Sequence, residues 1–223
     1  PALQWSAGDR RGIVEFTTAI APHPSARSPI RSLAAEVRTM TENFSGHVRG
    51  PKTDDELIQD AMHELPYGIY VIGSSSGDRP NAMIADWVMQ VSFSPRLVAV
   101  AFEQDSTNLA NIRANNALTI NLLDDDSMEL ARAFVQPTSG AKVQGRSGEA
   151  AAVQHDKLAG IDYRRDSRGC PILDDALAWI GAEAEQSVEA GDHIIVIARV
   201  LDGAVEGSSD PLTSVITGWS YSG

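Results

Sequence analysis

The chain is poor in cysteine, in positive charge and in long apolar runs, and each shortage excludes a class of protein. A single cysteine among 223 residues, Cys170, excludes an internal disulfide framework and any site built from several cysteines. The 18 lysines and arginines are outnumbered by 30 aspartates and glutamates, which gives a net charge of −12. No basic run interrupts this acidic balance, so nucleic acid is a poor partner.

The apolar runs reach only a few residues, far short of a helix that spans a membrane. The first residues also lack the basic-then-apolar order of a signal peptide. We therefore expect a cytoplasmic protein with no membrane partner.

Several motifs of nucleotide and metal chemistry are missing as well. There is no Gly-x-Gly pair and no Walker loop, so the chain has neither a Rossmann fingerprint nor a P-loop. The histidines at positions 23, 47, 63 and 155 lack paired ligand spacing, and we predict no metal site. Gly73 to Gly77 formally matches the Gly-x-Ser-x-Gly nucleophile elbow. It leads into another strand-like run and not into a helix, which favours a turn over a hydrolase site.

Apolar periodicity divides the chain into an N-terminal arm, residues 1–52, and a domain over residues 53–223. In the arm we expect a short strand over residues 13–20 and an amphipathic helix from Pro29 to near Gly46. Thr53-x-x-Glu56 is a capping box that predicts a second helix, which ends before Pro66.

The remainder is mostly strand-like, with short helices that begin near Ser106 and Asp126. We expect a polar turn over residues 74–78 between the first two of six strands, which are Tyr67 to Gly73, Ala82 to Phe93, Leu97 to Phe102, Ala117 to Leu123, Ala176 to Val188 and His193 to Leu201. Short strands without regular strand–helix alternation predict an antiparallel barrel, not a doubly wound sheet.

Residues 136–168 show no clear periodicity, and a connection this long inside a compact domain is usually functional. We treat it as a candidate lid whose charges suit a dinucleotide pyrophosphate. It holds six of the 18 basic residues, namely Lys142, Arg146, Lys157, Arg164, Arg165 and Arg168.

The most informative stretch is Asn81 to Glu103, in which an Asn-x-Met-x-Ala-x-Trp lead-in precedes two strand-like runs joined by Ser94-Pro95. Further blocks follow in order: Leu65-Pro66-Tyr67-Gly68 before it, then Ile120-Asn121-Leu122-Leu123, Gly169-Cys170-Pro171-Ile172-Leu173, Ala178-Trp179 and Gly191-Asp192-His193. The ordered set resembles the flavin reductase-like family of FMN-binding split barrels, from about Asp55 to the C-terminus. The resemblance implies a mainly β fold, an antiparallel six-stranded split barrel with flanking helices.

The resemblance also implies which residues bind the cofactor. One segment, whose backbone meets the isoalloxazine and ribityl chain in the family, comprises Asn81, Met83, Ile84, Ala85, Asp86 and Trp87. Asp86 departs from the family's common serine. Ser106 and Asn108 match a phosphate-binding segment at a helix start, with Asn in place of Thr. Asn121 matches a ring contact. Alternatives stay open: an ordinary N-cap for Ser106, core packing for Trp87 and a satisfied strand residue for Asn121.

His193 matches the family histidine that lies near the flavin and the nicotinamide, where we expect it to act by positioning and electrostatics. A turn histidine at the start of a strand is the alternative. The resemblance implies an NAD(P)H-dependent flavin oxidoreductase that passes a hydride from NADH or NADPH to FMN. It further implies a homodimer and raises a partner monooxygenase as a recipient of reduced flavin.

Two other functions stay open at this point. One is a non-catalytic FMN-binding or electron-carrier flavoprotein, and the other is a partner-binding module whose barrel is structural.

Overall fold

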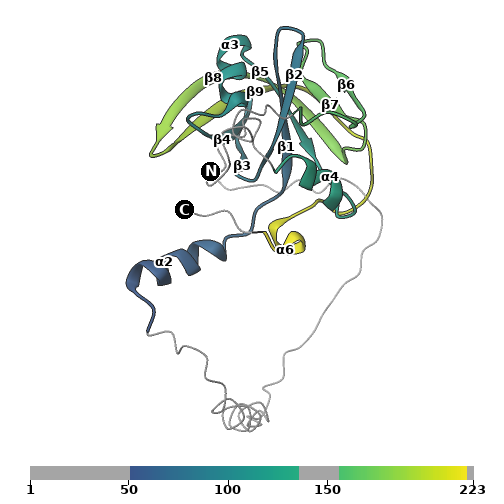
Figure 1. Cartoon of the computed structure of the whole chain (residues 1–223). Helices are drawn as coiled ribbons and strands as arrows, with labels where there is room; N and C mark the ends of the chain where they lie inside the picture. Colours follow the sequence, from purple (N-terminus) through teal and green to yellow (C-terminus); the bar gives the residue numbers. More distant parts are fainter. Residues whose placement is uncertain (1–50, 136–155, 220–223) are drawn as a thin grey trace, which may run out of the picture. The chain divides into compact units, whose positions relative to one another are not determined.

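The computed structural model describes residues 51–135 and 156–219 (Figure 1). The chain separates into two units after Pro51, and almost all of what is described belongs to the second unit. The strand expected over residues 13–20 and the amphipathic helix expected over residues 29–46 therefore lie outside the described residues. Among the residues that are described, no helix is long and apolar enough to cross a membrane.

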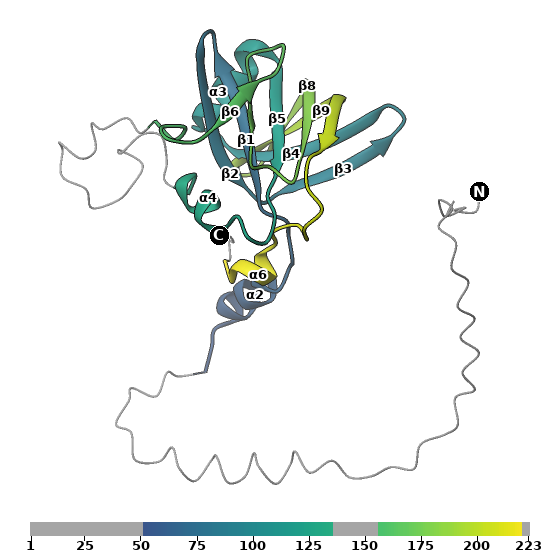
Figure 2. The same ribbon diagram turned by 90° about the vertical axis from the view of Figure 1, so that its right-hand side faces the viewer.

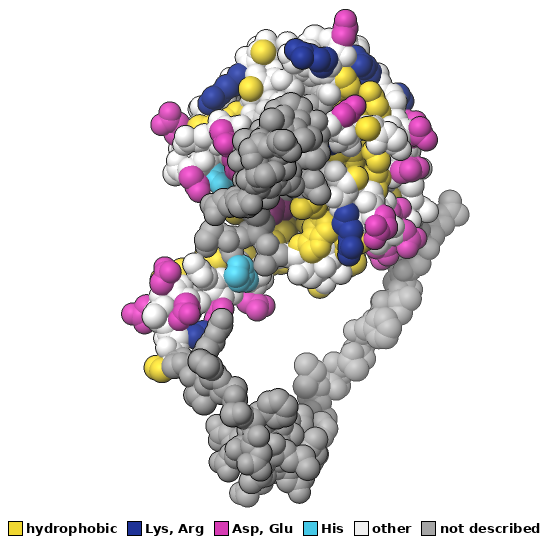
Figure 3. All heavy atoms as spheres, viewed as in Figure 1, with side chains coloured by type: hydrophobic (Ala, Val, Ile, Leu, Met, Phe, Trp, Pro, Cys, Tyr) yellow, Lys and Arg dark blue, Asp and Glu magenta, His cyan; other side chains and the backbone are white. Residues whose placement is uncertain are grey.

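Helix α2 (Asp54–His63) has the expected capping box. The Thr53 hydroxyl accepts a bond from the Glu56 N–H at 3.2 Å, and the Glu56 carboxylate accepts one from the Thr53 N–H at 2.7 Å. Acidic side chains line this helix (Figure 3), three of them in its first turn, where they complement the helix dipole. None of its residues is buried, so its apolar side chains, Leu57, Ile58 and Met62 among them, lie on the surface.

Seven strands form one antiparallel sheet in the order β2-β1-β5-β8-β9-β4-β3. They are β1 (Tyr70–Ser76), β2 (Arg79–Ala85), β3 (Val88–Phe93), β4 (Arg96–Glu103), β5 (Ala117–Leu122), β8 (Ala178–Ala190) and β9 (His193–Val205). Strands β2 and β3 are the two edges of the sheet, yet only Asp86 and Trp87 separate them in sequence. The sheet therefore curls until its edges approach each other at this corner, as in a split barrel (Figure 2).

The mainly β antiparallel fold confirms the sequence prediction, but the sheet has seven strands where six were expected. The single strand expected over residues 82–93 is two strands, because the chain turns at Asp86 and Trp87. The Val88 N–H donates to the Asp86 carbonyl across this turn at 3.0 Å. A corner of this kind lets one continuous segment serve both edges of the sheet.

The polar turn expected over residues 74–78 is wrong in its extent. Strand β1 continues to Ser76, and both Ser74 and Ser75 are buried. Only Gly77 and Asp78 form the turn into β2, with Gly77 at a φ of 57° that favours glycine. This segment is a β-hairpin and not the strand-to-helix junction of a nucleophile elbow.

Successive residues of the strands face two separate cores. Ile72 belongs to a cluster inside the curled sheet with Val100, Leu118 and Val196, against which helix α3 (Thr107–Asn115) also packs. Its neighbour Val71 belongs to a second cluster on the other face, which includes residues of helix α4 (Met128–Ala133) and of the segment leading to β7. The short helix α6 (Ser214–Thr217) follows a bridge between Gly68 and Thr213.

The described part of the candidate lid, residues 156–168, is built into the domain. It contains β6 (Tyr163–Arg165), which pairs with β7 (Pro171–Leu173) in a small antiparallel ladder. Its three arginines bind groups of the same domain: Arg164 binds Asp174 and Glu206, Arg165 donates to the Asp78 carbonyl, and Arg168 binds Asp166 and Asp202. These arginines hold the hairpin in place, which argues against a role for them at a dinucleotide. Lys142 and Arg146 lie outside the described residues.

Candidate functional site

Three segments meet where the two edges of the sheet approach each other. The Trp87 carbonyl accepts a backbone bond from strand β4 at 3.1 Å, which ties the corner to that strand. At its end β4 pairs with β9, where Glu103 lies opposite His193. Two residues later Asp105 precedes Ser106, the N-cap of helix α3. The topology thus brings the corner, the start of β9 and the start of α3 together.

Trp87 and His193 are in ring contact at this corner. Their ring centroids lie 4.9 Å apart with planes tilted by 48°. Trp87 as a whole residue is 40% exposed, whereas the side chain of His193 is only 12% exposed. His193 Nδ1 lies 2.7 Å from Asp192 Oδ1, and this hydrogen bond holds the pKa of Asp192 below its usual range, with the charge of His193 adding to the effect. The imidazole is therefore fixed on one side by a carboxylate and on another by an indole.

Asp86 contributes a half-buried carboxyl beside this ring pair. Burial raises its pKa above the usual range, while the N–H groups of Asp86 and Trp87 and the charge of His193 act in the opposite direction. The residue is consequently less readily ionised than a surface aspartate.

The candidate residues of β2 bind this strand to helix α3 and to the cores. The Asn81 side-chain amide donates to Asn108 Oδ1, and Met83 Sδ accepts from the Ser106 hydroxyl at 3.4 Å. Ala85 is buried in the inner core and Ile84 packs against the outer one. For these residues, contact with a ligand through the backbone is compatible with the structure.

The expected phosphate ligands, Ser106 and Asn108, are turned into the protein. Ser106 caps α3 by accepting a bond from the Leu109 N–H at 3.5 Å, as the N-cap alternative expected. Asn108 is 1% exposed, and its amide donates to the Ile72 carbonyl at 2.6 Å. Their side chains serve the packing of α3 against β1 and β2.

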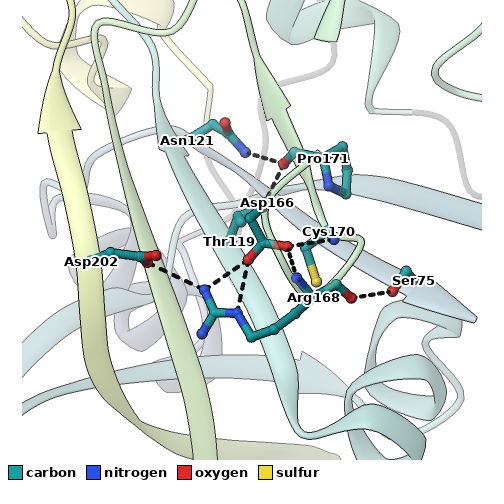
Figure 4. Close-up of polar contacts among 8 residues, drawn as sticks. All are labelled: Ser75, Thr119, Asn121, Asp166, Arg168, Cys170, Pro171 and Asp202. Atoms are coloured by element: carbon teal, nitrogen blue, oxygen red, sulfur yellow. Dashed lines mark hydrogen bonds and ion pairs between the residues drawn. The ribbon is translucent and has the colours of Figure 1, made fainter. Parts of the chain in front are cut away.

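Asn121 is a core residue, and the ring contact expected for its side chain finds no support. It is completely buried, and its amide donates to the Val71 carbonyl at 3.0 Å. The amide also lies 3.4 Å from the Pro171 carbonyl, to which it donates (Figure 4). Its Oδ1 accepts from the Leu173 N–H at 2.9 Å. The side chain joins β5 to β1 and β7, which is the satisfied strand residue left open by the sequence.

A polar network that the sequence did not indicate fixes the loop before β7 to the sheet (Figure 4). Arg168 binds Asp166 at 2.7 Å and Asp202 at 3.3 Å, and Asp166 also accepts from the N–H groups of Arg168 and Cys170. The Thr119 hydroxyl donates to the Pro171 carbonyl at 2.5 Å. Burial, and then the charge of Asp166, raises the pKa of the Cys170 thiol to about 11. Asp202 lies 34 residues from Arg168 and Pro171 lies 52 residues from Thr119, so no local signal in the sequence indicates these two contacts.

Within residues 51–135 and 156–219, no three His, Cys, Asp or Glu side chains are grouped in a way that would hold a metal ion.

Residues 62–215 match the flavin reductase like domain. The chain belongs to this family. It is 32% identical over 154 residues to the high molecular weight rubredoxin of Moorella thermoacetica, which is 69% of this chain and 62% of that protein. The flavin reductase of Pseudomonas putida is 26% identical over 160 residues, 71% of this chain and 85% of that protein. The solved structure of the flavin reductase PheA2 in its native state has 26% sequence identity and a TM-score of 0.57, and the match covers 72% of this chain and 93% of that one.

The chain is shorter than several of these relatives. It spans less than two thirds of the rubredoxin and 42% of the probable flavin reductase of Rhizobium meliloti.

Proposed function

We propose that this chain is an NAD(P)H-dependent flavin oxidoreductase, which transfers a hydride from a nicotinamide to a flavin, with FMN as the flavin that the sequence predicts. The observation that carries the proposal is the partly exposed Trp87, whose indole is in contact with the His193 ring at the corner of a flavin reductase-like barrel. An aromatic surface, nearby backbone groups and an imidazole donor are what a flat, hydrogen-bonding ring requires.

His193 acts in this proposal by positioning and charge. Its ring is held by Asp192 at 2.7 Å and by Trp87, so it presents a fixed orientation to the site. A bound flavin would supply the hydride acceptor. Hydride transfer needs no general acid in its first step, so an imidazole here favours the reaction by orienting the ring and by stabilising negative charge as it develops.

The other residues expected to bind the flavin have different roles in this proposal. The backbone of Met83, Ile84, Ala85 and Asp86, together with Trp87, lies along the corner where the ring and ribityl chain would bind. Asn81 supports this edge through Asn108. Asn121 takes no part, because its side chain is buried and bonded within the core.

We further propose that the active form is a homodimer. Strand β3 is an edge of the sheet, and its side chains Met89, Val91 and Phe93 are 63%, 41% and 84% exposed. An exposed apolar edge strand is unfavourable in water, and a second copy of the chain would bury these side chains next to Trp87. A cytoplasmic location and a partner monooxygenase that consumes reduced flavin complete the proposal.

Anaerobic titration of the flavin-reconstituted protein tests the activity. NADH and then NADPH are added while the visible flavin band is followed, and retention of the flavin is checked by gel filtration. Bleaching supports the reductase and identifies its nicotinamide. A retained but unbleached flavin would instead support the electron carrier, and failure to retain or reduce any flavin would support the partner-binding module.

A matched pair of variants tests the role of His193. His193→Gln should slow reduction by roughly tenfold or more while flavin binding changes little. His63→Gln, on the exposed helix α2, should leave both unchanged. Loss of flavin binding with normal reduction of the bound fraction would contradict the assigned role.

A further inference from the structure

Helix α2 carries an apolar stripe that remains exposed. Large apolar side chains recur along one side of it at helical spacing, and they belong to residues that are 49% to 62% exposed: Leu57, Ile58, Met62 and, just after the helix, Leu65. None of the residues of α2 is buried. An apolar stripe in water is unfavourable, so α2 offers a surface that a second segment can cover.

Strand β3 is a second exposed apolar surface, and α2 does not cover it within one chain. Met89, Val91 and Phe93 all remain exposed. Figure 2 shows β3 and β4 extending as a hairpin beyond the rest of the sheet, where another molecule can reach them. The two surfaces start near the same corner: β1, which follows α2, begins at Tyr70 opposite Ala85, and β3 begins shortly after Ala85. A second copy brought to this corner would therefore meet both surfaces.

The charges of the two surfaces are complementary. Arg96 pairs in register with Phe93 and is the only basic residue of β3 and β4. It forms no ion pair with the other described residues. Three acidic residues stand in the first turn of α2, and of its carboxylates only that of Asp60 forms a salt bridge in the described structure, with Lys52. An acidic helix repels a second copy of itself but attracts an exposed arginine, which favours α2 on β3 over α2 on α2.

The size of the contact also favours this arrangement. Stable interfaces take about 20–30 residues from each partner, whereas β3 supplies only 6. Helix α2 adds 10 residues. A two-fold axis repeats the contact, since each copy gives its helix to the other and receives one in return. The pair then approaches the usual interface size without any further element.

We propose that, in the homodimer, helix α2 of each copy packs across strand β3 of the other. The inference rests on the homodimer proposed above and names the segments that form it. The apolar stripe of α2 covers Met89, Val91 and Phe93, while the acidic side of the helix meets Arg96. Because β3 begins directly after Trp87, the helix of the second copy borders the proposed flavin site.

Cross-linking tests which segments meet, and the chain suits it because its one cysteine, Cys170, is buried with a pKa raised to about 11. Two full-length copies with different tags are co-expressed, one with Ile58→Cys and the other with Met89→Cys, and treated with a short bismaleimide. We expect a covalent dimer that contains one copy of each kind. Copies that all carry Ile58→Cys, or all Met89→Cys, should give little covalent dimer. Gln59→Cys in place of Ile58→Cys is the matched control on the polar side of α2.

Charged substitutions measure how much the contact contributes. Ile58→Glu and Met89→Glu should each weaken the dimer by roughly tenfold or more in sedimentation equilibrium, because each places a carboxylate in an apolar contact. Gln59→Glu adds the same charge on the polar side and should change the dissociation constant of the dimer by less than about threefold. Ile58→Glu combined with Met89→Lys should recover part of the loss, because the two new charges meet across the interface.

Contrary outcomes are distinct from one another. Cross-links within a copy that carries both cysteines, with none between copies, would show that α2 folds onto its own β3 and would overturn the inference. A dimer that cross-links only between like positions, or not at all, would overturn it as well. A chain that stays monomeric would remove the proposed homodimer together with this inference. Anaerobic flavin reduction, measured on the same preparations, decides the flavin reductase proposal separately.

Discussion

Replacement of Asn121 by alanine separates a core residue from a flavin contact. The Leu173 N–H would lose its acceptor inside the protein, which costs about 1–3 kcal/mol. The bonds donated to the Val71 and Pro171 carbonyls add roughly 1 kcal/mol. We therefore expect a loss of about 2–4 kcal/mol in the free energy of unfolding, or roughly 5–15 °C in Tm for a domain of this size.

Urea unfolding, followed by tryptophan fluorescence, measures this loss, and an unchanged slope would show that the folded state stays compact. Asn121→Asp should lower the free energy of unfolding more than Asn121→Ala does. The carboxylate keeps an acceptor for the Leu173 N–H, but it cannot donate to the Val71 carbonyl, and its charge would be buried. Gln59→Ala removes an exposed amide on α2 and serves as the control.

Flavin affinity, measured well below the unfolding transition, decides the interpretation. A core role predicts a dissociation constant within about twofold of the parent chain for Asn121→Ala. A variant with parental stability and strongly weakened flavin binding would refute the reasoning and restore Asn121 to the site.

Three further predictions follow. Gly181→Ala places a Cβ against Asp202 and the Arg168 guanidinium, so we expect a loss of about 1–3 kcal/mol in urea unfolding. Burial raises the pKa of Asp86, so the folded protein becomes less stable as pH rises through that raised pKa and the carboxyl ionises. Asp86→Asn should therefore stabilise the domain at neutral pH and give no advantage in acid, where the aspartate is protonated in both states. Thermal unfolding at several pH values measures the difference. The Cys170 thiol, with a pKa of about 11 and no exposure, should react with a thiol reagent at pH 8 only after unfolding.

Local features of the fold were predictable because their signals lie within a few residues of one another. The capping box at Thr53 and Glu56 needs only residues three apart, and it forms as expected. Strand positions follow from apolar content, so β4 and β5 fall close to their expected places.

The corner at Asp86 and Trp87 was not predictable in this way. It has neither glycine nor proline, and its turn arises because the closing sheet requires one there. At Ser74 and Ser75 the sequence predicted a turn where the structure has a strand. A serine-rich stretch is typical of turns, but here both serines are buried in β1.

Buried amides show why the site was harder to predict than the fold. An asparagine with donor and acceptor groups suits a ligand and a core equally well, and only its partners decide between them. Asn108 bonds a carbonyl 36 residues away, and Asn121 bonds an N–H 52 residues away. Such partners emerge only once the sheet order is known.

The position of the proposed site follows from the register of two strand ends. Glu103 and His193 are the last pair of the β4–β9 ladder, and His193 is also the first residue of β9 after the turn at Gly191. A shift of one residue in this ladder would turn His193 to the opposite face and remove it from Trp87. The ladder from Leu97 to Glu103 is unbroken, whereas the register shifts of β8 and β9 fall between Gly181 and Ala182 and between Ala184 and Gln186. The contact between the indole and the imidazole is therefore set by an unbroken ladder, although the β3–β4 pairing beside the corner carries a register shift of its own between Gln90 and Ser92.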